Sequence, residues 1–516
     1  MSNAAQAAWD HASATPDRIA LRGADHPWSY AKLRERVAAV AARLAEAGIA
    51  PGDRVLLIAP SVPEFAGAYY GILAAGAVAV TANTMSTRPE LEYAGTDAGV
   101  KLVLGWHDVV PAPADAAAAL GVHYWPLTDD LGDFPAGAPR DAPHATADDD
   151  NAVILYTSGT TGRPKGAQLT HGNLIACAEI FGEVLAFAPE DRFGTALPLF
   201  HVFGQAVVMG TTMHAGATLS LLERFGAEDL LDLLRRDRLT VMAGVPTMWN
   251  ALLHAPVGET DAADFASLRL AASGGAAMPA EVMRAFEERF GCVILEGYGL
   301  SETAGAATFN GLGRERKPSC VGIALPRCEV AVRGDDGADV GEGDVGEVYI
   351  KGPVVMKGYW NRPEATGEVL QDGWLRTGDL GTKDADGDIR IVDRKKDLII
   401  RGGYNVYPRE VEEVLYEHPD IVEVAVIGVP DAHFGEEVAA VIALRPGAEL
   451  DPPALRAWAK ERLSAYKVPR LFQTLDALPK GPTGKILKRA IDPEEVRAAS
   501  AGAARDAAAG ATGVAP

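Results

Sequence analysis

The stretch RVLLIAPSVPEFAGAYYGILAAGAVAV, residues 54–80, contains two short apolar runs separated by a segment with helical spacing. The runs Arg54 to Ile58 and Ala77 to Val80 are typical of buried strands, and residues 62–75 between them are typical of a helix. A strand, a helix and a second strand in this order predict a βαβ unit with parallel strands. This stretch therefore places the chain in the α/β class.

The same pattern extends in both directions from this unit. Apolar residues at helical spacing precede it and stop at Gly48, and further strands and a helix with Pro at its start and Gly at its end follow it. We expect a body with mainly parallel sheets. The segments are a helix through Leu33, Val37, Val40, Ala41 and Leu44, strands at 101–104, 152–156 and 292–295, and a helix at 279–290.

Past residue 320 the chain changes to short strands separated by Gly-Asp turns, which predicts a small β subdomain with strands at 321–323, 329–332, 347–351 and 389–392. A charged segment, DRKKD, then precedes a compact α+β stretch with helices at 408–417 and 453–463 and strands at 422–429 and 438–444. The predicted organisation is a large N-terminal domain (1–393) of two α/β subdomains plus the small β subdomain, a hinge (394–396), a small mobile α+β C-terminal domain (397–497) and a disordered tail (498–516).

Composition excludes several classes of function. The 516 residues carry a net charge of −22, so a sequence-independent grip on nucleic-acid phosphates is not expected. Four cysteines without a C-x-x-C pair form neither a disulfide framework nor a zinc ribbon, which favours a cytoplasmic protein. The N-terminus lacks the pattern of a secretory signal, and the most apolar stretch, 55–80, is interrupted by Pro60, Pro63 and Glu64, so no membrane span is expected.

The segment YTSGTTGRPKG, residues 156–166, has the composition of a phosphate-binding loop. Glycines let backbone N–H groups converge on anionic oxygens, hydroxyls add donors, and a lysine supplies charge. Its spacing differs from that of a P-loop, and an ordinary Gly/Thr-rich surface loop is the alternative. The candidate residues are Thr157, Ser158, Gly159, Thr160, Thr161, Gly162 and Lys165.

With these residues the sequence resembles the AMP-forming adenylate ligase superfamily, which includes acyl-CoA synthetases. The resemblance extends from about residue 15 to 490, and seven further motifs follow the signature loop in the order of that family. These are LPLFHVFG (197–204), SGGAAMP (273–279), EGYGLSET (296–303), GEVYIKGP (346–353), WLRTGDL (374–380), DRKKDLIIRGGYNVYPREVE (393–412) and PKGPTGKILKR (479–489).

The resemblance implies a role for each matched residue toward ATP. Tyr298 stacks on adenine, Asp379 accepts both ribose hydroxyls with Arg394 adding a donor, and Glu302 with Thr157 holds Mg²⁺. Lys485 stabilises charge on the carboxylate and the α-phosphate, and His201 gates the acid beside it. Taken singly, Tyr298 could be a core tyrosine, Asp379 a turn former, His201 structural and Lys485 a solvated lysine. The resemblance also places Gly274, Gly275, Ala276, Glu296, Gly297, Gly299, Thr303 and Ile391 at the nucleotide.

Three further groups of residues follow from the resemblance. The expected acyl pocket is His201, Val202, Phe203, Gly204, Val245, Met248, Trp249, Gly275, Ala276 and Ala277, with Met248 and Trp249 limiting its depth. Lys396 is the expected pivot of the hinge. Rotation about it withdraws Lys485 and brings Arg401, Gly402, Gly403 and Tyr404 to the site for coenzyme A.

The resemblance implies an enzyme with ATP and coenzyme A as cosubstrates and Mg²⁺ as cofactor. It joins a carboxylic acid to coenzyme A through an acyl-adenylate, and the uncharged pocket favours medium- to long-chain fatty acids. Two alternatives stay open: an aryl-acid–CoA ligase, and an adenylating enzyme that passes the acyl group to a carrier protein or an unusual nucleophile. Self-association as a homodimer also stays open.

Overall fold

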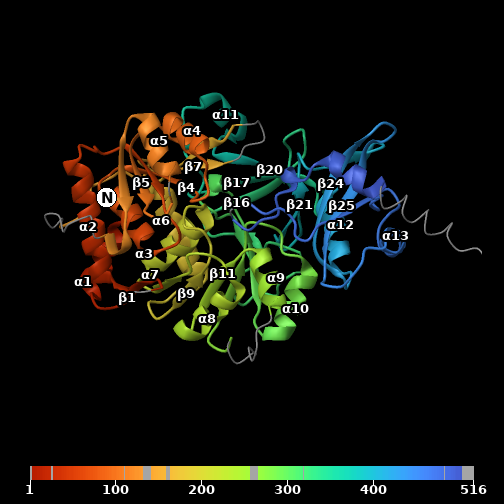
Figure 1. Ribbon diagram of the computed structural model, residues 1–516, viewed down its shortest axis with the longest axis horizontal. Coiled ribbons are helices and arrows are strands. Elements are labelled where there is room, and N and C mark those ends of the chain that lie inside the picture. The colour runs from red at the N-terminus through yellow and green to blue at the C-terminus, as the bar shows by residue number, and fades with distance from the viewer. Residues whose placement is uncertain are drawn as a thin grey trace, which may run out of the picture.

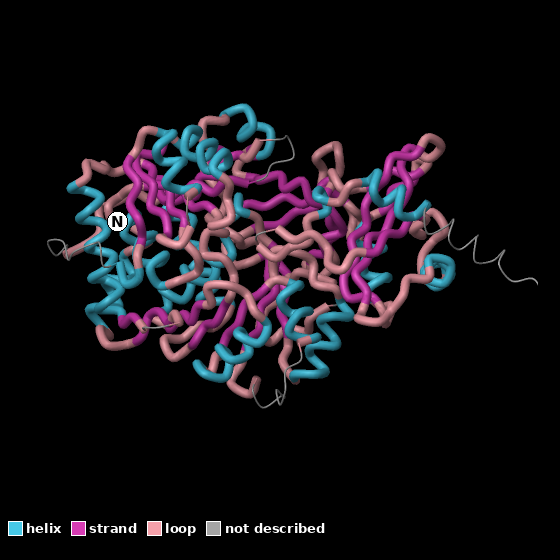
Figure 2. The backbone as a smooth tube through the Cα atoms, viewed as in Figure 1, coloured by secondary structure: helices cyan, strands magenta, loops and turns pink. Residues whose placement is uncertain are grey.

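The computed structural model describes residues 3–24, 27–109, 111–131, 141–157, 163–255, 265–317, 319–481 and 483–501, which form four β-sheets and the helices around them. Figure 1 shows the N-terminal part, coloured red to green, beside the C-terminal part in blue. The cyan helices of the N-terminal part lie around its magenta strands (Figure 2).

The quoted βαβ unit forms the centre of a seven-stranded sheet. β3 (Arg54–Ile58) and β4 (Val78–Ala82) pair in parallel, and α3 (Pro63–Ala74) between them is buried along its whole length. The spatial order is β18-β8-β7-β4-β3-β5-β6. The other members are β5 (Val100–Trp106), β6 (His123–Leu127), β7 (Asn151–Thr157), β8 (Lys165–Thr170) and β18 (Gly358–Tyr359), with α4 (Arg88–Ala98) and α5 (Ala112–Leu120) nearby in the chain.

A second sheet has nine strands, of which the central six are parallel. Its order is β15-β14-β13-β12-β11-β9-β10-β1-β2. The strands are β1 (Ile19–Arg22), β2 (Trp28–Ser29), β9 (Arg192–Thr195), β10 (Thr218–Leu221), β11 (Val241–Gly244), β12 (Leu270–Ser273), β13 (Ile294–Tyr298), β14 (Thr308–Phe309) and β15 (Ile323–Ala324).

The helices of this region include α10 (Ala280–Phe290), where the sequence predicted one. Pro279 is its N-cap and Gly291 ends it with φ of +64°. The following strand, β13, begins at Ile294 instead of the expected Cys292. Residues 292 and 293 connect the end of α10 to the strand, and Ile294 N–H donates a hydrogen bond to the Glu287 carboxylate of that helix. The other helices are α1 (Gln6–Ala14), α2 (Tyr30–Glu46), α6 (His171–Val184), α7 (Thr211–Ala215), α8 (Ala227–Asp237), α9 (Pro246–His254) and a π-helix at Phe203–Gly210.

The small β subdomain has five antiparallel strands, and the run expected at 321–323 joins it only in part. Ile323 begins β15, which pairs with β14 of the nine-stranded sheet. Val321 and Gly322 instead form main-chain hydrogen bonds with Ile389 of the small subdomain, and Val321 packs in its hydrophobic cluster. The five strands are β16 (Glu329–Arg333), β17 (Gly346–Lys351), β19 (Leu370–Gln371), β20 (Trp374–Lys383) and β21 (Ile389–Arg394), with α11 (Pro363–Val369) before β19.

Residues after the hinge segment form a separate sheet with its own hydrophobic clusters, here called the C-terminal unit. Its order is β23-β22-β25-β24, and β26 pairs with β25. The expected tail is corrected at its start, because 493–501 are helical and Ser500 Oγ accepts a bond from Phe472 N–H. The elements are β22 (Ile399–Arg401), β23 (Tyr404–Val406), α12 (Pro408–Tyr416), β24 (Ile421–Asp431), β25 (Gly435–Leu444), α13 (Pro452–Lys460) and β26 (Leu471–Thr474).

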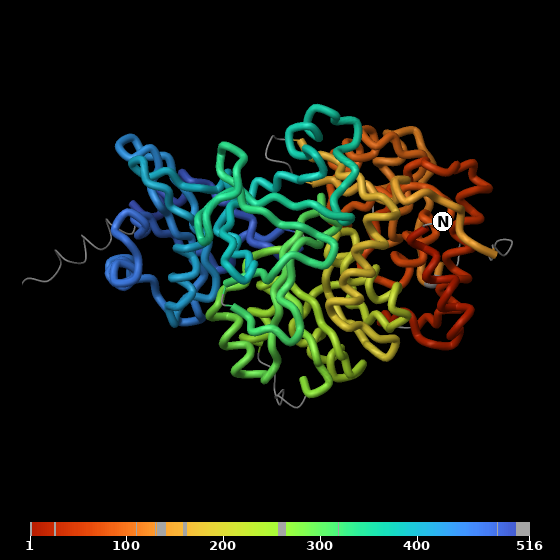
Figure 3. The backbone as a smooth tube through the Cα atoms, turned by 180° about the vertical axis from the view of Figure 1, so that it is seen from behind, coloured from red at the N-terminus to blue at the C-terminus, as the bar shows by residue number. Residues whose placement is uncertain are grey.

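The C-terminal unit packs against the nine-stranded half of the body. Figures 1 and 3, from opposite sides, both place it beside the green segment that contains α9 and α10. The α10 and α12 helices are in contact, and Tyr416 of α12 packs on the hydrophobic cluster that contains Trp249. None of the helices in the described ranges combines the length and apolarity that a membrane crossing requires.

Candidate active site

A cavity of about 1750 Å³ lies where the two large sheets, the small β subdomain and the C-terminal unit meet. The carboxyl ends of β7, β11, β12 and β13 open into it, which is where open parallel sheets bind ligands. Most of the residues predicted from the sequence line it. They are Thr157, Lys165, His201, Val202, Phe203, Val245, Gly274, Gly275, Ala276, Ala277, Glu296, Gly297, Tyr298, Gly299, Glu302, Asp379, Ile391, Arg394, Lys396 and Lys485.

Both arms of the predicted phosphate-binding loop line this cavity. Thr157 at the end of β7 pairs directly with Lys165 at the start of β8. The ammonium of Lys165 lies 5.2 Å from the ring centroid of Tyr359, and Tyr93 donates a hydrogen bond to the Pro164 carbonyl. The tip of the loop, with Ser158, Gly159, Thr160, Thr161 and Gly162, lies outside the described residues.

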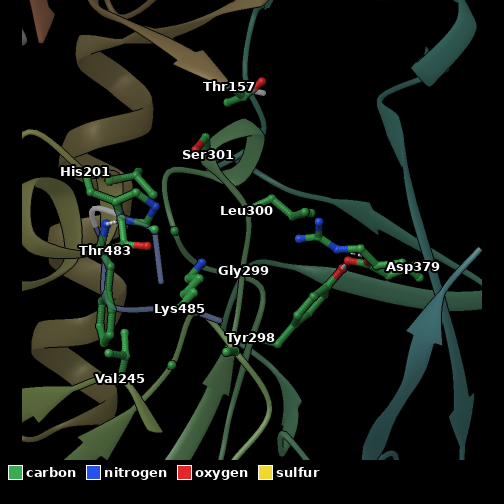
Figure 4. A pocket seen from close by; sticks show the side chains of 18 of the residues that line it. Thr157, His201, Val245, Tyr298, Gly299, Leu300, Ser301, Asp379, Thr483 and Lys485 are labelled. Atoms are coloured by element: carbon green, nitrogen blue, oxygen red, sulfur yellow. Dashed lines mark hydrogen bonds and ion pairs between the residues drawn. The ribbon is translucent and has the colours of Figure 1, made fainter. Parts of the chain in front are cut away.

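Tyr298, Asp379 and Arg394 form a connected group on one side of the cavity. The Tyr298 hydroxyl donates to Asp379 Oδ2 at 2.5 Å, and Arg394 Nε lies 3.6 Å from Asp379 Oδ1 (Figure 4). Burial raises the pKa of Asp379, and Arg394 opposes that shift. Asp379 lies within β20 directly opposite Arg394 of β21, so the expected turn is a strand, although Gly378 before it has φ of +75°.

Glu296 of β13 also lines the cavity. Its side chain is buried, and burial raises its pKa to about 7. Oε1 accepts a hydrogen bond from Met278 N–H, whereas Oε2 has no partner among the described residues. Through its bond to Met278 N–H the carboxyl fixes the segment that follows Gly274–Ala277.

The segment after Tyr298 presents Ser301 and Glu302 to the cavity, and it corrects one prediction. Glu302 Oε1 accepts a hydrogen bond from the Tyr359 hydroxyl at 2.9 Å. Ser301 lines the cavity between Thr157 and Lys485 in Figure 4. Thr303, predicted at the nucleotide, is buried away from the cavity, because its hydroxyl bonds both main-chain groups of Leu300 and closes the turn.

Lys485 reaches into the cavity from the C-terminal unit. Its amino group points between His201 and Leu300 (Figure 4), and a Cβ added to Gly275 would meet its Cε at 2.9 Å. Burial, followed by repulsion from Arg394, lowers the pKa of Lys485 to about 8, and Asp379 opposes the shift. Gly275, with φ of +80°, therefore leaves room for the lysine that a side chain would take.

His201 lies on the opposite side of the lysine from Tyr298. Burial and the neighbouring Lys485 lower its pKa to about 3, so the ring is neutral at physiological pH. Its Nδ1 accepts a hydrogen bond from Phe203 N–H. The loop before it is anchored to the seven-stranded sheet, because Ser61 bonds the Leu197 carbonyl and Thr81 bonds the Phe200 carbonyl.

The apolar wall of the cavity differs in part from the prediction. Gly204, Met248 and Trp249 do not line it. Trp249 points to the other face of β11 and packs edge-on against Phe286, while an added Cβ on Gly204 would meet the Pro198 carbonyl oxygen at 2.5 Å. Seven apolar residues that belong to one hydrophobic cluster also line the cavity, and we call them the apolar limb: Phe181, Leu185, Phe193, Val202, Val207, Ala243 and Phe309.

The predicted coenzyme A segment lies outside this cavity, on the β22–β23 hairpin. Arg401 is buried, ion-paired with Glu437, and its guanidinium carbon lies 4.1 Å from the Phe434 ring centroid. Gly402 and Gly403 have φ of +58° and +83°, and the exposed Tyr404 stacks on Tyr466. In this arrangement the Arg401 side chain pairs with Glu437 and stacks on Phe434, both within the C-terminal unit.

Several cavity residues carried no clear signal in the sequence. Ser301 and Tyr359 sit within or beside quoted motifs, but their orientation depends on the turn at Leu300 and on the pairing of β18 with β8. Phe181, Phe193 and Val207 look like ordinary core positions. They could have been identified only by asking which predicted helices and strands end at the cavity.

Oxygen ligands suited to Mg²⁺ are present at the cavity as the Glu302 carboxylate and the Thr157 hydroxyl. Among the described residues one cluster of three acids also occurs, at Asp384, Asp386 and Asp388. The Lys317 ammonium already lies 2.5, 2.6 and 3.1 Å from its carboxylate oxygens. The donor set at the cavity therefore fits the metal better than this cluster does.

The chain matches known proteins over most of its length. The family model for the AMP-binding enzyme matches residues 8–360, and that for the AMP-binding enzyme C-terminal domain matches residues 410–485. The chain is 36% identical to a long-chain-fatty-acid–CoA ligase of Bacillus subtilis over 94% of this chain and 93% of that protein. It is 39% identical to a feruloyl-CoA synthase of an Amycolatopsis species over 95% and 98%. The crystal structure of ATP-bound MatB from Rhodopseudomonas palustris superposes with a TM-score of 0.88, at 36% identity and 94% and 98% coverage.

Proposed function

This chain belongs to the AMP-binding enzyme family and is an AMP-forming acid–CoA ligase, and on that premise we propose that its acid substrate is a medium- to long-chain fatty acid. The observation that carries the proposal is the apolar limb. All seven of its side chains are apolar, and it opens from the cavity that also holds His201 and Lys485. An alkyl chain buried there gains about 0.8 kcal/mol per methylene.

The first half-reaction joins the acid to ATP. A carboxylate oxygen attacks the α-phosphorus, a new P–O bond forms, and the bond to pyrophosphate breaks. The Lys485 ammonium offsets the negative charge that gathers on the carboxylate and the α-phosphate, and the Ser301 hydroxyl is placed to donate to the same phosphate. Neutral His201 borders the acid without adding charge.

The nucleotide is held by the residues on the other side of the lysine. Tyr298 presents its ring to adenine, and its bond to Asp379 fixes both side chains. The buried Asp379 carboxylate accepts the ribose hydroxyls, with Arg394 as a further donor. Thr157 and Glu302 would hold Mg²⁺, which supplies charge neutralisation for the phosphates when bound.

The second half-reaction transfers the acyl group to coenzyme A. The thiolate sulfur attacks the acyl carbon, a thioester forms, and AMP leaves with the electron pair of the broken C–O bond. We place Lys396 at the pivot of a rotation that withdraws Lys485 from the cavity. The same rotation brings the β22–β23 hairpin, with Gly402, Gly403 and Tyr404, to the cavity. Arg401 supports this hairpin through Glu437.

Four free cysteines, two of them buried, support a reducing compartment, and we place the protein in the cytoplasm. An aryl acid is the second candidate for the substrate, favoured by the feruloyl-CoA synthase relative and by three phenylalanines in the limb.

The proposal is tested with a panel of acids. Pyrophosphate release and thioester formation would be measured with octanoate, palmitate, benzoate and a cinnamate, each with and without coenzyme A. We expect the highest kcat/KM for octanoate or palmitate, and release that proceeds to thioester only with coenzyme A. A preference for cinnamate or benzoate by tenfold or more would assign the aryl alternative instead.

A further inference from the structure

Helix α9 links the wall of the acid site to the C-terminal unit. It begins at Pro246, directly after Val245, which lines the cavity beside Lys485. Thr247 and Asn250 are three residues apart, so they share one face of the helix. In Figure 1 this helix lies beside the blue C-terminal unit.

Both side chains donate hydrogen bonds across the boundary between the two parts. Thr247 Oγ1 donates to the Gly484 carbonyl at 2.7 Å, and Asn250 Nδ2 donates to the Val422 carbonyl at 3.1 Å. Gly484 precedes Lys485 in the chain. A Cβ built on it would lie 3.3 Å from both Thr247 Oγ1 and Val245 Cγ2, so the backbone there is seated against the start of α9.

These two bonds depend on the arrangement of the parts. Donors and acceptors lie on opposite sides of the hinge at 394–396, so a rotation that withdraws Lys485 breaks both. A contact made in only one of two arrangements favours that arrangement by the free energy of the contact. Asn250 is buried, which raises the cost of leaving its amide without an acceptor.

We propose that Thr247 and Asn250 are positioning residues that latch the C-terminal unit in the arrangement in which Lys485 enters the cavity. The inference rests on the proposed two-step reaction. Thr247 acts through Lys485, since its hydroxyl holds the carbonyl of Gly484, the residue before the lysine. Ser319, which contacts Glu413 of α12 at 3.2 Å, adds a third polar contact across the same boundary but lies far from residue 485 in the chain.

The primary test replaces Thr247 with valine, which keeps the shape and removes the donor. One net hydrogen bond is worth about 0.5–1.5 kcal/mol, so Thr247→Val should lower ATP–pyrophosphate exchange roughly 2- to 12-fold. Transfer to coenzyme A from supplied acyl-adenylate should be unchanged or faster. Thr247→Ser, which keeps the hydroxyl, is the matched control and should restore exchange.

A double-mutant cycle separates a latch from a general structural role. In a Lys485→Ala background the lysine no longer acts, so adding Thr247→Val should cause no further loss of exchange. Hydrogen–deuterium exchange of residues 483–487 in the ATP-bound protein should be faster in Thr247→Val than in the parent. This second readout does not require turnover.

Asn250→Leu removes the second hydrogen bond, to the Val422 carbonyl, and is measured in the same assays with the same expected result. The proposal therefore does not depend on the folding of one variant. Equal loss of both half-reactions in Thr247→Val, a full further loss in the Lys485→Ala background, or wild-type exchange in both single variants would overturn the latch. Absence of pyrophosphate exchange in the wild-type protein with every acid would instead overturn the proposed function.

Discussion

Lys485 shows how one residue acquires its chemistry from its surroundings. The ammonium is buried and lies near Arg394, and both effects favour the neutral amine, whereas Asp379 favours the charged form. The result is a lysine whose pKa is about 8 in place of the ordinary value of 10.5. Bound triphosphate would add negative charge beside it and raise that pKa again.

The pH dependence of adenylation follows from this shift. Because the pKa is lowered, the charge of Lys485 is present below pH 8 and is lost as the pH rises through about 8, well before an ordinary lysine would titrate. We expect kcat/KM for ATP in pyrophosphate exchange to fall above pH 8, since this parameter reports the free enzyme. The measurement is an exchange profile from pH 6 to 10.

Two variants control this profile. Lys485→Ala should lower exchange by orders of magnitude and abolish the decline above pH 8, while transfer from supplied acyl-adenylate stays largely intact. Lys485→Arg keeps its charge across the pH range, so its exchange should be slower overall but should not decline above pH 8. An unchanged decline in either variant would assign the titration to another group.

At the scale of elements, the segment between β21 and β22 has the properties of a hinge. Residues 394–396 are exposed, Lys395 contacts Asp335 at 2.8 Å and Glu347 at 3.4 Å, and Asp393 accepts bonds from the N–H groups of Arg394 and Arg409. These contacts fix the residues on either side of Lys396. The backbone N–H of Lys396 has no partner among the described main-chain hydrogen bonds.

Lys396→Pro tests the hinge because it restricts the backbone at and before this residue, which lies in the turn closed by the hydrogen bond from Asp397 N–H to the Arg394 carbonyl. Proline removes no described hydrogen bond at this position, but it fixes φ and restricts the residue before it. We expect acyl-adenylate to form at a rate within a few-fold of wild type while thioester formation falls by orders of magnitude. Single-turnover assays of the two half-reactions would show this.

Lys396→Ala is the matched control, since it removes the charge and leaves the backbone free. It should complete both half-reactions. If Lys396→Pro also completes both at wild-type rates, the pivot lies at another residue of the segment.

At the scale of the whole molecule, charge and burial together restrict the acid. The protein carries a net charge of −22, and the seven limb residues are all apolar. A second carboxylate or an ammonium group on the acid would be buried in the limb without a partner. Such burial costs several kcal/mol.

Malonate and free amino acids should therefore be poor substrates. A cost of about 4 kcal/mol corresponds to a loss of roughly a thousandfold in kcat/KM relative to a fatty acid of similar or greater length. Competition assays with malonate, glycine and octanoate under one set of conditions measure the ratio. Efficient use of malonate would show that a cation reaches the acid, against the lining seen here.

The amino-acid sequence by itself determined the α/β class, the βαβ unit at 54–80 and the positions of five helices (α2, α3, α10, α12 and α13), because these depend on local periodicity and on caps such as Pro279 and Gly291. It also identified the polar residues that meet at the cavity, since motifs record which chemistry is present. It misplaced Thr303, Gly204, Met248 and Trp249, because a motif does not state which way each of its side chains points.

Only the tertiary structure decided those orientations and the contacts between distant segments. The division of 321–323 between two sheets, the apolar limb, the Tyr298–Asp379 bond and the lowered pKa of Lys485 all arise from residues far apart in the chain. Burial and neighbouring charge exist only once the sheets and the C-terminal unit have packed together. For that reason the sequence could name Lys485, but only the fold showed what holds it in place.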